Sequence, residues 1–180
     1  MKTDNQQQEI CSTLEQLVSA LLDKPKQFKI HLTPSQRRPI YTMTCDLSDY
    51  GVIIGKQGTM LQSLRHITDR MAASAGLEAE LMLDEAGCTG QKRIRGQFTP
   101  NPEWTNEEMD KLAHLTLPQI LRSAVTIGWD TISSTSSKMT IVAKFQDDTE
   151  QRQDEDALEQ IFKSIGVRQG RIIKLELVSQ

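Results

Sequence analysis

Residues 49–65, DYGVIIGKQGTMLQSLR, carry the most informative pattern in this chain. At its centre the tetrad Gly55–Gly58 separates an apolar run, Val52–Ile54, from a helical pattern that starts at Thr59. Because glycine has no Cβ atom, two glycines three positions apart let the backbone approach a phosphodiester closely. Lys56 adds a positive charge between them. The tetrad alone is equally compatible with a purely structural turn.

The residues around the tetrad predict an α+β unit. Thr59-x-x-Gln62 has the form of a capping box, which predicts a helix start, and Gly76 has the position of the residue that ends this helix. An amphipathic helix is predicted before Pro25, and a short helix ends at Ile54. Alternating apolar residues predict strands over 27–33, 39–45 and 77–83. The predicted order is helix, strand, strand, helix, G-x-x-G, helix, strand.

A nucleotide-binding P-loop is excluded by its spacing. That motif needs G-x-x-x-x-G-K followed by Ser or Thr. Between Gly51 and Lys56 the chain is one residue too short, and Gln57 stands where the metal-binding hydroxyl would be. The sequence therefore does not predict an NTP-dependent enzyme.

Residues 49–65 resemble the core signature of a KH domain, and residues 9–84 are similar to the type II, prokaryotic arrangement of that family. They are most similar to small bacterial KH proteins, in which a short helix ends in I-G-K-x-G and a long helix follows. The resemblance implies a three-stranded sheet with helices on one face. It also implies that the loop clamps the backbone of about four single-stranded nucleotides while their bases lie in a narrow groove.

The resemblance also implies which residues would bind nucleic acid. Unpaired N–H groups and the positive dipole end at the start of a helix favour a phosphate there. The groove floor is expected opposite one face of the strand at residues 40–45. The expected contacts are Gly55, Lys56, Gln57, Gly58, Thr59, Val52, Ile54, Leu61 and Arg65. For the three apolar residues the alternative is a place in the core, and for Arg65 it is a solvated helix face.

A basic cluster follows the segment that resembles a KH domain. Lys92, Arg93 and Arg95 place three positive charges within four positions. They either extend the binding surface along the phosphate chain or form an ordinary charged linker.

Composition limits how such a protein can bind. The net charge is −3, which argues against coating nucleic acid by bulk charge. Residues 1–96 carry 12 Lys/Arg and 11 Asp/Glu, a net of +1, whereas residues 97–180 carry 9 and 13, a net of −4. Any nucleic-acid surface is therefore expected in the first half. The aromatic content of 4% argues against stacking each base on a ring.

Other residues offer no pattern for catalysis, metal binding or membrane insertion. Cys11, Cys45 and Cys88 form no C-x-x-C pair and are expected to be unlinked thiols. The three histidines share no metal-ligand spacing. No cofactor, metal site, catalytic residue or membrane span is predicted, and a cytoplasmic location is expected.

The second half is predicted to be a separate, acidic α+β domain of unknown role. We place the boundary at the break Pro100–Pro102 and assign residues 1–96 and 97–180 to the two domains. The sequence predicts a helix that Pro118 either kinks or restarts, a strand over 138–145, an acidic loop over 147–156, a helix ending at Gly166 and a strand over 171–178. This domain is either a degenerate second KH-like unit or a small domain for protein contacts or self-association.

Two functions remain open at this point. The first is non-catalytic binding of single-stranded nucleic acid, RNA in preference to DNA, through the G-x-x-G loop and an apolar groove. The second is an adaptor that uses a KH fold for protein contacts, with the loop unused. The intact glycines and Lys56 favour the first, and the acidic net charge favours the second.

Overall fold

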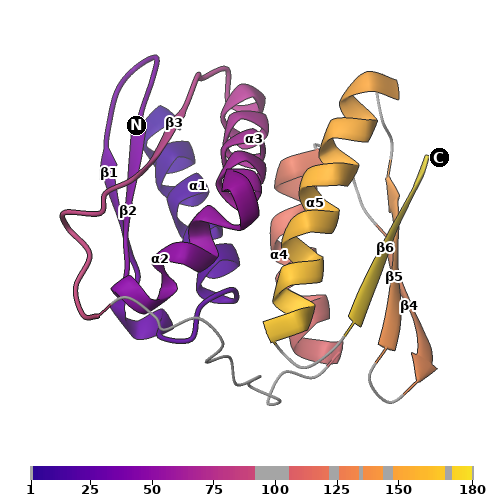
Figure 1. The fold of residues 1–180 in the computed structure, drawn as a ribbon. Helices are drawn as coiled ribbons and strands as arrows, with labels where there is room; N and C mark the ends of the chain where they lie inside the picture. Colours follow the sequence, from indigo (N-terminus) through magenta and orange to yellow (C-terminus); the bar gives the residue numbers. More distant parts are fainter. Residues whose placement is uncertain are drawn as a thin grey trace. The chain divides into compact units, whose positions relative to one another are not determined.

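The computed structural model describes residues 2–91, 106–121, 126–133, 136–143, 148–168 and 172–179. The chain divides into two compact units, Met1–Phe98 and Thr99–Gln180, which we call unit 1 and unit 2. Each unit combines helices with a three-stranded sheet (Figure 1). The predicted α+β class is therefore confirmed.

Unit 1 places its helices on one face of a mixed sheet (Figure 1). Strand β1 pairs antiparallel with β2, and β2 pairs parallel with β3, in the order β1-β2-β3. The long elements are, in chain order, α1 (Lys2–Ser19), β1 (Lys29–Thr33), β2 (Ile40–Thr44), α2 (Leu47–Ile54), α3 (Thr59–Ser74) and β3 (Glu80–Leu83). Two short 3₁₀ turns, η1 (Pro25–Gln27) and η2 (Lys56–Gly58), connect them.

The core of unit 1 lies between the helices and the sheet. Tyr41 and Met43 of β2 are fully buried, as period-2 alternation on a half-buried strand requires. The helices supply apolar stripes at 3.6-residue spacing, which are buried as well: Ile10, Leu14, Leu17, Val18 and Leu21 from α1 and its C-terminal turn, and Met60, Leu64, Ile67 and Met71 from α3. Each fully buried side chain of this size contributes about 1.5–3 kcal/mol by leaving water.

Two buried carboxylates fix the start of α2. Asp46 is the N-cap residue, and its Oδ1 accepts from the Ser48 amide at 2.9 Å and its Oδ2 from Lys24 Nζ at 2.9 Å. Asp49, which is fully buried, accepts from the backbone amides of Asp23 at 3.1 Å and Lys24 at 2.9 Å. These bonds attach the segment that follows α1 to the helix that precedes the tetrad.

The structure confirms the predicted C-terminal end of α3 but not the predicted N-terminal cap. Gly76, with φ 71°, follows the helix, and the amides of Gly76 and Leu77 donate to Ala73 and Ala72. This is a Schellman ending, so the predicted glycine stop is confirmed. The predicted capping box at Thr59 is wrong, because Gly58 occupies the N-cap position. The 3₁₀ turn moves the cap one residue upstream of the hydroxyl.

Unit 2 repeats the strand pairing of unit 1. Strand β4 pairs antiparallel with β5, and β5 pairs parallel with β6, in the order β4-β5-β6. Its elements are α4 (Asn106–Leu121), β4 (Thr126–Ser133), β5 (Ser136–Ala143), α5 (Asp148–Arg168) and β6 (Ile172–Ser179). A single helix, α5, makes the crossover between the parallel strands, where unit 1 uses α2 and α3. Leu158, Ile161, Phe162 and Ile165 of α5 are fully buried.

Several predictions for the second half are corrected. The acidic stretch over 147–156 was expected to be a loop, but its described part is helical, since α5 begins at Asp148. The same helix continues to Arg168, past its expected end at Gly166. Acidic residues are favourable at a helix N-terminus, which explains why this polar stretch is helical. Helix α4 runs through Pro118 without a restart, and β4 was not predicted.

Some predicted features lie outside the described residues. These are the basic cluster Lys92, Arg93 and Arg95 and the boundary at Pro100–Pro102. Within the described part of the chain, none of the helices has the length and apolar character that a membrane span requires.

Replacing Asp49 with Ala is expected to destabilise unit 1 by about 2–4 kcal/mol, because the amides of Asp23 and Lys24 would lose their charged acceptor. Asp49→Asn should cost less, since its amide oxygen still accepts one bond. The urea dependence of hydrogen exchange in unit 1 peptides measures this loss. Both tryptophans belong to residues 99–180, so the tryptophan fluorescence transition should stay unchanged. Equal losses for the Ala and Asn variants would contradict the assignment.

Asp46 is expected to make unit 1 acid-sensitive. Its hydrogen bonds with Ser48 and Lys24 lower its pKa from 3.8 to about 2. Since the folded-state pKa is the lower one, the stabilisation is present above about pH 4 and is lost as the pH falls towards 2. The difference in unfolding free energy between wild type and Asp46→Asn should therefore shrink over this range, as followed by hydrogen exchange in unit 1. A difference that stays constant from pH 5 to 2 would refute this origin.

Candidate functional site

The tetrad forms a tight reversal between two helices. Gly55 ends α2 with φ 74° and ψ −178°, a region that is open essentially to glycine alone. Gln57 has φ 55° and Gly58 has φ 82°, both in the left-handed region. Three positive φ angles within four residues turn the chain from the end of α2 directly into the start of α3.

The two glycines are required for different reasons. A Cβ atom on Gly55 would lie 2.6 Å from the Cβ and 2.8 Å from the backbone nitrogen of Met60, so the start of α3 leaves no room for it. A Cβ atom on Gly58 would have no heavy atom within 4 Å. Gly55 therefore serves packing as well as conformation, whereas Gly58 serves conformation alone.

The reversal presents the positive end of a long helix to solvent. Lys56 and Gln57 are exposed beside it, and Gly58 has no side chain with which to cap α3. The Thr59 hydroxyl donates to Lys56 O at 2.9 Å, so it stabilises the turn instead of capping the helix. Helices α1, α2 and α4 each carry an acidic residue in their first turn, but α3 carries none. An anion at this position would meet a helix dipole that no acidic residue of the first turn offsets.

Apolar surface flanks the reversal on both sides. Val52 and Ile54 on α2 and Leu61 on α3 are half-buried, whereas their neighbours Ile53 and Met60 are buried in the core. The structure thus brings the three predicted groove residues to the surface next to the loop.

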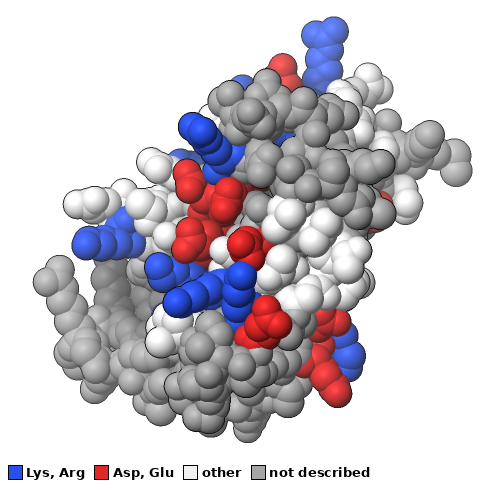
Figure 2. Space-filling view, turned by 90° about the vertical axis from the view of Figure 1, so that its right-hand side faces the viewer, with Lys and Arg blue, Asp and Glu red and all other residues white. Residues whose placement is uncertain are grey.

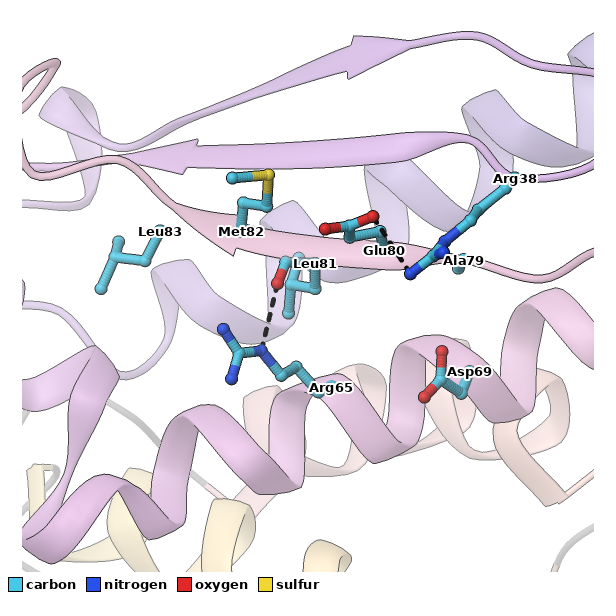
Figure 3. A pocket seen from close by; sticks show the side chains of 8 residues that line it. All are labelled: Arg38, Arg65, Asp69, Ala79, Glu80, Leu81, Met82 and Leu83. Carbon is cyan, nitrogen blue, oxygen red and sulfur yellow. Dashed lines mark hydrogen bonds and ion pairs between the residues drawn. The ribbon is translucent and has the colours of Figure 1, made fainter.

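A groove lies between α3 and β3 (Figure 3). Its volume of about 390 Å³ is at the small end of the range for ligand pockets. It is lined by Arg38, Arg65, Asp69, Ala79, Glu80, Leu81, Met82 and Leu83. Met82 is 44% exposed, so part of the lining is accessible apolar surface.

Arg65 and the acidic residues define the polar side of this groove. Arg65 Nε donates to the Leu81 carbonyl at 3.2 Å and so links α3 to the edge of β3 (Figure 3). At one end Arg38 pairs with Glu80 at 3.2 Å, in an ion pair that solvent screens. Burial raises the pKa of Asp69. The groove therefore offers both hydrogen-bond donors and acceptors beside an apolar wall.

Only part of this arrangement was predicted from the sequence. Of the predicted residues, Arg65 lines the groove, while Gly55–Gly58 and Thr59 lie at the start of the same helix. The opposite wall was expected on the strand at 40–45, but β3 forms it, because β2 is the central strand and only β3 presents an edge to α3. Arg38 and Asp69 were missed, and nothing in their local sequence would have pointed to them.

Unit 2 shows no comparable reversal in its described residues. Gly166–Arg168 form the last turn of α5. Figure 2 shows Lys and Arg side chains (blue) intermixed with Asp and Glu side chains (red) on one face. In unit 2, Lys138 of β5 pairs with Glu176 of β6. No group of His, Cys, Asp and Glu suited to a metal ion occurs among the residues described in either unit.

Gly55→Ala is expected to destabilise unit 1 by about 3 kcal/mol or more, since strain and a clash with backbone add up. Gly58→Ala should cost only about 1 kcal/mol, the usual penalty of a left-handed Ala. Urea-dependent hydrogen exchange in α2 and α3 measures both. Equal losses in the two variants would contradict the packing role of Gly55.

Known proteins resemble this chain within unit 1. The family model of the KhpA/KhpB KH domain matches residues 12–83. A protein of Oceanobacillus iheyensis described as "RNA-binding protein KhpA" is 30% identical over 54 residues, which are 30% of this chain and 72% of that protein. Together with the α+β fold and the G-x-x-G reversal, these matches show that the chain, through residues 12–83, belongs to the KhpA/KhpB family of KH domains.

Proposed function

We propose that unit 1 binds single-stranded RNA without catalysing a reaction. The observation that carries this proposal is the reversal at Gly55–Gly58, which leaves the positive end of α3 open next to the exposed Lys56. The similar protein of Oceanobacillus iheyensis is described as RNA-binding, which supports RNA as the ligand. The order α1-β1-β2-α2-α3-β3 supports the type II form of the KH fold.

In the proposed complex the phosphate backbone lies on the loop and the bases lie across α3. Gly55, Lys56, Gln57, Gly58 and Thr59 are the proposed backbone contacts. Val52, Ile54 and Leu61 beside the loop, and Arg65 in the groove, are the proposed contacts with the bases. Arg65 is six residues beyond Thr59, about 9 Å along the helix axis. One strand of RNA can therefore contact the loop and the groove together.

Binding of this kind depends on few charges. Unit 1 has almost no net charge, so the affinity would come from a small number of placed contacts. A shallow dependence on salt would follow, since each neutralised phosphate contributes one counterion-release step. A contribution from Lys92, Arg93 and Arg95 would make the dependence steeper.

For unit 2 we propose a KH-like unit without the loop. Its strand order and pairing match those of unit 1, while its crossover is one uninterrupted helix. The net charge of −4 over residues 97–180 does not favour a phosphate chain, so we assign this unit to protein contacts or self-association in the cytoplasm. An adaptor role for the whole protein remains the alternative to RNA binding.

The double variant Lys56→Asp, Gln57→Asp is expected to weaken binding of a short labelled single-stranded RNA about 10- to 100-fold. Two carboxylates would replace a charge-assisted contact with repulsion, and each factor of ten corresponds to about 1.4 kcal/mol. Fluorescence anisotropy at fixed salt measures the affinity.

The chain contains a matched control for this variant. Lys26 and Gln27 repeat the Lys-Gln pair, are exposed, and lie in the other 3₁₀ turn, η1. Lys26→Asp, Gln27→Asp changes the net charge by the same amount and should leave the affinity within about twofold, because it acts only through the overall field. If both double variants bind as wild type does, the loop is not the site. If the wild type itself does not bind, the adaptor function is favoured.

A further inference from the structure

Cys45 and Cys88 are 43 positions apart in the chain, yet their sulfur atoms lie 3.7 Å apart. Cys45 is buried directly after β2, and Cys88 is half-buried in the segment that follows β3. The Cys88 sulfur also accepts from the Cys45 amide at 3.3 Å and donates to Asp84 O at 3.2 Å. The two thiols thus form a cluster that the proposed RNA-binding surface does not use.

Backbone hydrogen bonds hold the two cysteines together. The Thr89 amide donates to Cys45 O at 3.1 Å, and the Leu47 amide donates to Thr89 O at 2.7 Å. Cys45 itself takes part in the first bond, and Thr89, which takes part in both, is the residue after Cys88. The chain path therefore brings the two cysteines together, and their side-chain rotamers place the sulfur atoms 3.7 Å apart.

Two glycines allow this close approach. A Cβ atom on Gly90 would lie 2.4 Å from Asp46 Oδ2, and one on Gly87 would lie 2.7 Å from Thr44 Cγ2. Because Gly87 and Gly90 have no side chain, residues 84–90 can pack closely against the junction of β2 and α2. From this position the sulfur atoms need to move closer by less than 2 Å to reach the bond length of a disulfide, about 2.05 Å.

We propose that Cys45 and Cys88 form a redox-active dithiol that a low-molecular-weight disulfide converts into an intramolecular disulfide. The Cys88 thiolate attacks one sulfur of the small disulfide, which forms a mixed disulfide and releases one small thiolate. Cys45 then loses its proton and attacks the Cys88 sulfur, the mixed bond breaks, and the second small thiolate leaves. Two electrons pass from the protein to the small disulfide, which takes up the two protons as two small thiols.

The surroundings assign the order of the two steps. Burial, followed by the contacts with Cys88, raises the pKa of Cys45 to about 12, so this thiol is protonated near neutrality. Cys88 is the more exposed of the two, so a small disulfide in solution reaches its sulfur first. Cys88 is therefore the attacking cysteine and Cys45 the resolving one.

The experiment uses the full chain, equilibrated in mixtures of oxidised and reduced glutathione and then quenched with an alkylating reagent. Intact mass and peptide mapping should show one internal Cys45–Cys88 bond that dithiothreitol reverses. Cys11, which is buried in α1, should be alkylated only after unfolding. Cys11→Ser should oxidise as wild type does, and Cys88→Ser should form no internal disulfide.

A second variant keeps the proposal testable if one replacement disturbs the fold. Cys45→Ala keeps Cys88 and should trap it as a stable glutathione adduct, whereas wild type should resolve that adduct. Hydrogen exchange at the Leu47 and Thr89 amides should slow in the oxidised protein. A persistent glutathione adduct on wild-type Cys88, or a bond only between two chains, would overturn the proposal.

Discussion

Helices α2 and α3 can meet only because Gly55 has no side chain. Any Cβ atom there would overlap the backbone at Met60, so the end of α2 and the start of α3 could not meet. Their contact sets the angle between two helices whose buried faces cover one sheet. The same contact fixes the loop that separates them. The packing of the core and the shape of the candidate site therefore share one steric origin.

Helix α3 connects the parts of the candidate site. Its start receives the turn at Gly58, its buried stripe forms core with β2, and Arg65 ties its outer face to the edge of β3. Because the loop precedes α3 directly and Arg65 belongs to the same helix, α3 sets the separation of the loop from the groove. A site of this kind can bind with little net charge, because well-placed contacts supply binding free energy that long-range electrostatic attraction would otherwise supply.

The sequence predicted what depends on local patterns. The G-x-x-G turn, the alternation in β2 and the Gly76 stop follow from conformational rules that act within a few residues. It failed where distant residues decide. Thr59 looked like a cap until the 3₁₀ turn was known, and β3 could not be recognised as the groove wall without the strand order. The acidic start of α5 resembled a loop because its apolar residues come later in the helix. The pairing of Cys45 with Cys88 depends on the path of the chain after β3 and has no local signal.

The uncapped start of α3 has a thermodynamic consequence. Helix α3 has neither a capping side chain nor an acidic residue in its first turn. It therefore lacks the stabilisation that acidic first-turn residues give to α1, α2 and α4. In the free protein this end of α3 is therefore the place where the helix should fray first. A phosphate bound there would serve as the missing cap. Ligand binding would then be the last step in the folding of α3, and the protein would become more cooperative as well as more stable when it is occupied.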